Sequence, residues 1–142
     1  ALVRIKLKKQ KCLTLGNLYA VRDWGHAKDY VESMWKILQY KKPDDWVIAT
    51  NEEMTVKKFI NKCIKKLGIK IQWKYKGIKE IAIDKVSKKI IIKIDKNFFR
   101  PGEVDFLKGD YSKAKKLLKW KPKYKCDDLI NDMIRYETGL YE

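Results

Sequence analysis

The chain has 142 residues, of which 45% are hydrophobic and 37% charged, proportions that are typical of one folded domain and exclude a disordered segment. Its net charge of +16 comes almost wholly from lysine, because only four of the 34 basic residues are arginine. The lysines occur in nearly every segment, which indicates a solvated exterior that attracts polyanions at low salt rather than a dedicated nucleic-acid surface.

The N-terminal third predicts a short strand and a helix. Residues 3–8 follow no start signal and residue 1 is not methionine, so we expect a chain that is truncated or processed at its front. Residues 12–15 can form a strand that ends in a turn at 16–17. Residues 27–38 are predicted to form an amphipathic helix that ends near Pro43. Its apolar positions follow a spacing of three and four: Ala27, Tyr30, Val31, Met34, Trp35 and Leu38.

The middle of the chain predicts one helix among short strands. The apolar run at residues 46–49 is predicted to be a buried strand. Thr55 has the position of an N-cap for a helix over residues 56–67, and Gly68 follows where a C′ glycine belongs. Alternating apolar residues predict two further strands, at residues 69–73 and 89–95.

The C-terminal third predicts two helices, one that begins at Ser112 and one that begins at Asp127 or Asp128, separated by residues 120–122. The expected fold is therefore a single mixed α/β lobe of helices and short strands over residues 1–142. No glycine-rich turn joins a strand to a helix, so we expect no Rossmann nucleotide-binding sheet in this chain. Tyr111 and Lys115 have Tyr-x-x-x-Lys spacing, but chance explains that spacing in so lysine-rich a sequence, and we expect no catalytic residue here.

The cysteines and the single histidine exclude several kinds of site. The three cysteines are far apart and without pattern, which argues against a zinc site or a disulfide framework and favours a reducing, cytoplasmic compartment. His26 stands at a predicted helix start, where a capping or packing role is the commoner one. With these cysteines and one histidine we expect no metal site. No apolar run approaches the roughly 18 residues that span a bilayer, so we also expect no membrane partner.

Two arginines, Arg22 and Arg100, lie in segments that are otherwise poor in positive charge. A guanidinium can hold phosphate oxygens with two parallel donors, which lysine cannot do. Two arginines that converge from separate loops would form a clamp for a diphosphate. The residues alone leave open a second interpretation, in which each arginine pairs with a nearby carboxylate such as Asp23 or Glu103.

Three segments resemble sequence signatures of known enzymes. Residues 15–18 and 22–31 resemble a signature of the GDP-mannose 4,6-dehydratase family, which belongs to the extended short-chain dehydrogenase/reductase group. Residues 99–110 resemble that family's second signature, and residues 112–122 are similar to a motif that many sugar-nucleotide epimerases and dehydratases share. The resemblance covers essentially the whole chain but only the C-terminal, substrate-binding part of the family's sequence.

The resemblance implies a role for each candidate site residue. Arg22 and Arg100 would hold the diphosphate of GDP-mannose, Glu103 would accept hydrogen bonds from ribose hydroxyls, and Asn17 would lie beside the nucleotide. Two alternatives remain: Asn17 serves only its turn, and Glu103 only orients Arg100. We expect Trp24, Asp29 and Tyr30 to be structural, with Asp23 or Asp29 fixing the start of the helix.

Four positions depart from the family pattern. Tyr19 stands where an aspartate is common and Val21 where a lysine is common, so the finer contacts of the loop before Arg22 differ. Gly102 replaces an alanine, and Tyr111 replaces a turn residue.

The resemblance also implies a reaction, the NADP-dependent conversion of GDP-mannose to GDP-4-keto-6-deoxymannose. NADP and the acid/base residues would belong to an N-terminal Rossmann half that this chain lacks. The isolated chain is therefore expected to be inactive, and the full-length protein is expected to be a homo-oligomer. The alternative from another functional class is a basic nucleic-acid-binding module without enzymatic activity.

Overall fold

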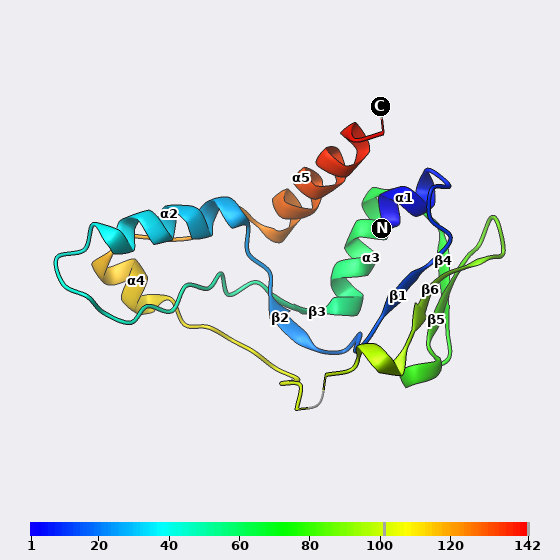
Figure 1. Ribbon diagram of the computed structural model, residues 1–142, viewed down its shortest axis with the longest axis horizontal. Coiled ribbons are helices and arrows are strands. Elements are labelled where there is room, and N and C mark those ends of the chain that lie inside the picture. The colour runs from blue at the N-terminus through cyan, green and yellow to red at the C-terminus, as the bar shows by residue number, and fades with distance from the viewer. Residues whose placement is uncertain (101, 142) are drawn as a thin grey trace.

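The computed structural model describes residues 1–100 and 102–141, and these residues form a mixed α/β structure, as the sequence predicts (Figure 1). The helices are α1 (Leu2–Lys6), α2 (Ala27–Leu38), α3 (Val56–Lys66), α4 (Ser112–Leu117) and α5 (Cys126–Gly139). The strands are β1 (Leu13–Leu15), β2 (Val21–Asp23), β3 (Glu53–Thr55), β4 (Ile71–Lys74), β5 (Ile81–Asp84) and β6 (Ile90–Ile94). Two short 3-10 helices, η1 (Gly77–Lys79) and η2 (Lys96–Phe98), complete the described elements.

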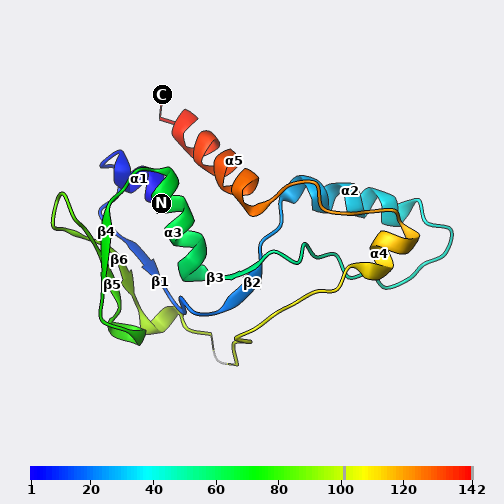
Figure 2. The same ribbon diagram turned by 180° about the vertical axis from the view of Figure 1, so that it is seen from behind.

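One end of the molecule is a sheet covered by helices. The sheet has the order β1-β6-β5-β4, in which β1 and β6 are parallel and the other neighbours antiparallel. Helix α3 packs on this sheet, and α5 lies beside α3 (Figure 2). The buried residues of this core are Leu18, Ile60, Ile64, Ala82, Ile91 and Ile92. Burial of these side chains, which come from α3, from strands β5 and β6 and from the loop after β1, holds the layers together.

The helix predicted at residues 56–67 is confirmed, with both of its ends. The hydroxyl of Thr55 accepts a hydrogen bond from the backbone N–H of Lys58 at 3.1 Å, and Gly68 has the left-handed backbone (φ +69°) of a helix C′ position. A second sheet consists of β2 and β3, which are antiparallel, and β3 leads directly into this helix.

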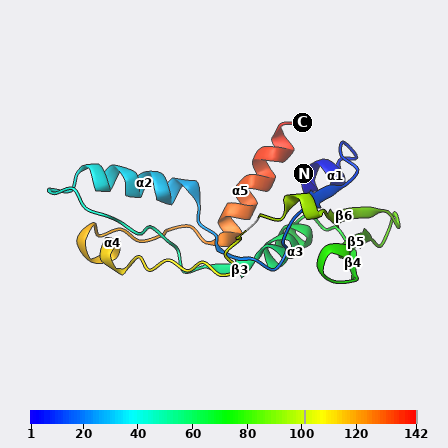
Figure 3. The same cartoon turned by 60° about the horizontal axis from the view of Figure 1, so that its bottom comes forward.

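The other end of the molecule consists of α2 and α4, which lie side by side and away from the sheet (Figure 3). A small separate core joins them around the buried residues Ala114, Leu118 and Trp120. The indole of Trp120 also donates a hydrogen bond to the backbone oxygen of Asp29 at 3.0 Å. Helix α2 begins at the predicted residue but ends at Leu38, before the predicted end near Pro43. The helices predicted at Ser112 and at Asp127 or Asp128 correspond to α4 and α5.

The buried strand predicted at residues 46–49 is wrong. These residues have no strand partner among the described ones, although Trp46 and Ile48 do pack into the α2–α4 core. The strand of this region is β3, four residues later, because β2 offers it an antiparallel partner. Within the described residues, no helix is both long and apolar enough to cross a membrane.

Candidate functional site

The site candidates lie where β2 meets the segment 103–106. The backbone N–H of Val21 donates to the oxygen of Asp105 at 2.7 Å, and Val21 forms a parallel bridge with Phe106. Two segments more than 80 residues apart in the sequence are thereby held side by side. This pairing brings the side chain of Arg22 to the loop that contains Glu103 and Arg100.

The guanidinium of Arg22 is held by three hydrogen bonds. Nη1 donates to the backbone oxygens of Val21 at 2.8 Å and Val104 at 2.7 Å, and Nη2 donates to Oε1 of Glu103 at 2.9 Å. The pairing of Arg22 with a nearby carboxylate is therefore observed, and the carboxylate is Glu103 rather than Asp23. A guanidinium has five N–H donors. Within the described residues, Nε–H and one Nη2–H of Arg22 remain without a partner.

Arg100 lies on the same loop as Glu103. The backbone N–H of Glu103 donates to the oxygen of Arg100 at 3.2 Å, and Gly102 between them has φ +69°, a conformation that favours glycine. Pro101, part of the second signature, lies outside the described residues. Arg100 is exposed, and the described contacts do not join its side chain to Glu103. The alternative expectation is that Glu103 only orients Arg100; among the described contacts its carboxylate pairs with Arg22.

Asn17 occupies a turn, and its side chain is part of that turn: Oδ1 accepts the backbone N–H of Tyr19 at 2.9 Å. Tyr19 is one of the four positions that depart from the pattern the sequence resembles, and its hydroxyl donates to Oε2 of Glu80 at 2.7 Å. Glu80 is 1% exposed, and its other oxygen is paired with Lys57. The hydrogen bond to Glu80 raises the pKa of Tyr19, so the hydroxyl stays protonated as a donor. The hydrogen bond from Tyr19, which is half exposed, to buried Glu80 fixes the loop between Asn17 and Arg22.

Asp23 fixes a different segment from the one expected. Its carboxylate accepts hydrogen bonds from the backbone N–H groups of Thr50 and Asn51 and from the hydroxyl of Thr50, at 2.8 to 3.1 Å. Asp29, which is 1% exposed, accepts the backbone N–H groups of Lys123 and Tyr124. Both carboxylates are structural, but they hold loops from other parts of the chain rather than the start of α2.

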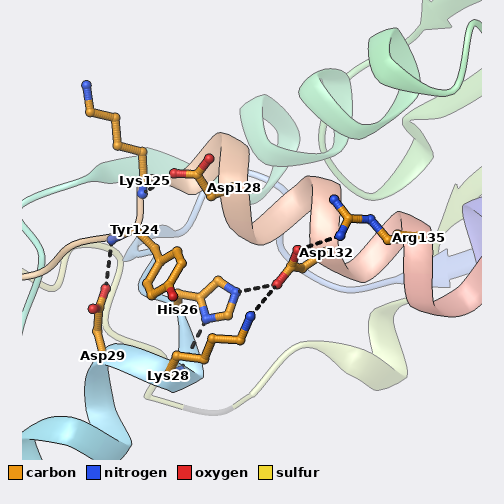
Figure 4. A network of polar contacts seen from close by, with 8 residues as sticks. All are labelled: His26, Lys28, Asp29, Tyr124, Lys125, Asp128, Asp132 and Arg135. Atoms are coloured by element: carbon orange, nitrogen blue, oxygen red, sulfur yellow. Dashed lines mark hydrogen bonds and ion pairs between the residues drawn. The ribbon is translucent and has the colours of Figure 1, made fainter.

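The start of α2 is capped by His26 itself, which confirms the capping role (Figure 4). Its Nδ1 accepts the backbone N–H of Lys28 at 3.2 Å, so the proton is on Nε2, which donates to Asp132 of α5 at 3.2 Å. Lys28 also donates to Asp132, at 3.0 Å. These hydrogen bonds lower the pKa of Asp132, with Lys28 contributing most. The network joins α2 to α5.

Gly16 lacks the setting of a phosphate-binding turn, and the three cysteines lack the setting of a reactive thiol. Gly16 follows β1, but it opens no helix, and a side chain there would collide with the backbone oxygen of Phe98, so its close approach serves the protein's own packing. Burial raises the pKa of Cys63 to about 11, and it also raises the pKa values of Cys12 and Cys126. All three are therefore protonated at neutral pH and poor nucleophiles.

Solved structures define the class of this fold. The UDP-glucose 4-epimerase of Thermotoga maritima, solved with UDP-glucose, has a TM-score of 0.71 at 20% identity. The match covers 99% of this chain and 38% of the epimerase chain. RMD of Pseudomonas aeruginosa, complexed with NADPH, has a TM-score of 0.70 at 14% identity. The match covers 94% of this chain and 38% of the RMD chain. The chain has the fold of a part of these two proteins.

Sequence comparison then defines the family. The family model described as GDP-mannose 4,6 dehydratase matches residues 1–133, and the chain belongs to this family. The GDP-mannose 4,6 dehydratase of Homo sapiens is 44% identical over 140 residues, which are 99% of this chain and 38% of the human protein. GDP-mannose 4,6 dehydratase 1 of Arabidopsis thaliana is 47% identical over 140 residues, which are 99% of this chain and 34% of the plant protein. The chain thus spans little more than a third of the length of these relatives.

Proposed function

We propose that this chain is the sugar-nucleotide-binding part of a GDP-mannose 4,6-dehydratase, and that it binds GDP-mannose with Arg22 and Arg100 on the diphosphate. The observation that carries the proposal is the arrangement of Arg22. Its guanidinium is fixed by Glu103 and two backbone oxygens, yet it keeps two N–H donors that no described residue uses.

Fixing the guanidinium in advance favours anion binding. An arginine that is already ordered loses less side-chain entropy when a phosphate binds, and its remaining donors can bond two phosphate oxygens. Arg22 is only partly accessible, with 28% of its side chain exposed, which strengthens a charge-assisted hydrogen bond relative to one in bulk water. Arg100, exposed on the loop that Glu103 anchors, would supply the second half of the clamp.

Glu103 and Asn17 would complete the nucleotide contacts. Oε1 of Glu103 accepts from Arg22, which leaves Oε2 as an acceptor for ribose hydroxyls. Oδ1 of Asn17 accepts from the turn, which leaves the side-chain N–H groups as donors toward the nucleotide. In this proposal both residues have two roles, one in the fold and one in binding.

The chemistry of the reaction would belong to polypeptide beyond this chain. The relatives are more than twice as long, and Gly16 after β1 opens no helix, so in this proposal NADP and the acid/base groups would be held by a separate Rossmann half. Binding the remote nucleotide would still contribute to catalysis, because it places the mannose against that half. A full-length assembly of this kind would be a homo-oligomer.

The location of binding can be tested by nuclear magnetic resonance of the isotope-labelled chain. Addition of GDP-mannose is expected to shift the backbone amide signals of residues 16–22 and 102–105 first. Shifts confined to other parts of the chain, such as β4 and β5, would contradict the proposal. Guanosine, which lacks phosphates, is the matched control ligand and is expected to shift these signals far less.

A further inference from the structure

The ring of Tyr19 is a fixed aromatic surface in the loop between Asn17 and Arg22. Its backbone N–H donates to Oδ1 of Asn17 at 2.9 Å, and its hydroxyl donates to buried Glu80 at 2.7 Å. Both ends of the residue are anchored, yet Tyr19 is 48% exposed. An aromatic side chain that is ordered in advance loses little conformational entropy when a flat ligand stacks on it.

The anchor of Tyr19 is itself fixed. Glu80 is buried, and its second carboxylate oxygen is paired with Lys57 of α3. The ammonium of Lys57 lies over the ring of Tyr19, 5.5 Å from its centre, and 4.8 Å from the ring centre of Trp73 in β4. Attraction between the cation and these rings adds to the hydrogen bonds in holding Tyr19. The cation occupies one face of the Tyr19 ring, which leaves the opposite face for a ligand.

A second exposed aromatic residue adjoins the same turn. Phe98, the last residue of η2, is 60% exposed. Its backbone approaches Gly16 so closely that a side chain there would collide with the oxygen of Phe98. The glycine thus allows η2 to lie against the turn that contains Asn17. Aromatic side chains on such a surface stack on nucleobases, because every base has a π-face.

The side-chain oxygens around this loop are already in use. Oδ1 of Asn17 accepts from the backbone of Tyr19, and both carboxylate oxygens of Glu80 are paired. Both oxygens of Asp23 accept from the 50–51 segment. The remaining side chains of the loop are apolar: Leu18, Ala20 and Val21. Among the described residues, this loop therefore offers no free side-chain carboxylate or amide oxygen to the C2 amine that distinguishes guanine from adenine.

The amide of Asn17 suits both purines. Since Oδ1 faces the turn, the side-chain N–H groups are the donors that Asn17 offers to a nucleotide. N7 is a hydrogen-bond acceptor in adenine and in guanine alike. A donor beside an aromatic surface therefore fits a purine without distinguishing the two.

We propose that the base of the bound sugar nucleotide stacks on Tyr19, and that this site accepts either purine instead of selecting guanine. The ligand class is a purine nucleoside diphosphate sugar. This inference rests on the proposed function, because it takes Arg22 and Arg100 as the diphosphate contacts. It adds a specificity-determining residue, Tyr19, and it widens the ligand class beyond GDP-mannose.

The stacking contact is tested by nuclear magnetic resonance of the chain saturated with GDP-mannose. Intermolecular nuclear Overhauser effects are expected between the ring protons of Tyr19 and H8 of the base. Tyr136 on α5 is the control, since it is 71% exposed but lies outside the proposed site, and it is expected to show none. A saturated complex without these effects at Tyr19 would overturn the inference.

Two variants separate the ring from the hydroxyl. Tyr19→Phe and Tyr19→Leu both lose the hydrogen bond to Glu80, so they share any loosening of the loop, but only Tyr19→Phe keeps an aromatic ring. Once circular dichroism shows that both are folded, calorimetry is expected to find GDP-mannose bound about fivefold or more weakly by Tyr19→Leu than by Tyr19→Phe. Equal affinities of the two variants would contradict stacking.

Base selection is measured with ADP-mannose and the wild-type chain. Its affinity is expected to lie within about fivefold of that of GDP-mannose, because stacking tolerates either base. A preference for GDP-mannose of about fiftyfold or more would overturn the inference. If the wild type binds neither ligand, the proposed function fails together with the inference. If it binds GDP-mannose through Arg22 but the two Tyr19 variants bind equally, only the inference fails.

Discussion

Glu103 accepts a hydrogen bond from Nη2 of Arg22 at 2.9 Å, although the two residues are 81 positions apart in the sequence. The backbone pairing of Val21 with residues 105 and 106 makes this contact possible. The contact joins the two segments that resemble family signatures into one site, with Arg100 on the same loop.

Replacement of Arg22 by lysine is expected to weaken GDP-mannose binding about tenfold or more. Lysine keeps the positive charge, but its three N–H donors cannot serve the three protein acceptors of Arg22 and a phosphate together. Each lost charge-assisted hydrogen bond costs about 1.5 to 3 kcal/mol. Isothermal titration calorimetry measures the change. The control is Arg135→Lys, since the side chain of Arg135 is 81% exposed on α5. Equal losses in both variants would indicate a general charge effect instead of a clamp.

Replacement of Tyr19 by phenylalanine is expected to destabilise the chain by about 1 to 3 kcal/mol, because buried Glu80 loses the donor to its Oε2. Urea unfolding followed by circular dichroism gives the free energy of unfolding. Tyr75→Phe is the control, since Tyr75 is 68% exposed. An unchanged free energy for Tyr19→Phe would mean that Glu80 contributes nothing to holding the loop before Arg22.

The hydrogen-bond network between α2 and α5 is expected to weaken at acidic pH. The pKa of Asp132 in the folded chain is lowered by its hydrogen bonds to Lys28 and His26, so its stabilising contribution is present above its ordinary pKa of about 4. The contribution is lost as the pH falls through the lowered value. Wild type is therefore expected to lose more stability between pH 5 and pH 3 than Asp132→Asn does, measured by urea unfolding. The same loss in both proteins would refute the role of Asp132.

Salt dependence separates a diphosphate clamp from a nucleic-acid surface. GDP-mannose binding is expected to change only mildly between 50 and 200 mM salt, because one diphosphate is contacted. Binding to duplex DNA through six or more phosphates would fall about a thousandfold or more over the same range. Fluorescence anisotropy with labelled DNA provides the second measurement. Tight DNA binding that persists at 200 mM salt would favour the nucleic-acid module.

Local sequence signals predicted α2, α3, α4 and α5, but they did not predict α1. The spacing of apolar residues gave the bounds of α2, and the cap at Thr55 and the glycine at residue 68 marked the ends of α3. The same periodicity could not show that α2 turns Asp29 and Ser33 inward and its apolar side outward. That orientation depends on the backbone groups of residues 123 and 124, which are distant in the sequence.

The short strands were harder to predict because they depend on partners. Strands β2 and β3 have three residues each, and β5 has four, so their sequences carry almost no alternation and pairing decides their conformation. Residues 46–49 form an apolar run but have no strand partner among the described residues. For the site, the sequence identified Arg22, Arg100 and Glu103 as candidates, but pairing of Glu103 with Arg22 rather than Arg100 required the contact between β2 and residues 103–106.

The most direct test of the account is calorimetric titration of GDP-mannose into the purified chain, without NADP and at physiological salt. The account predicts saturable one-to-one binding that is retained with GDP, lost with guanosine, and weakened about tenfold or more by Arg22→Lys or Arg100→Lys. Absence of saturable binding by the folded wild-type chain, or binding that neither arginine affects, would contradict it.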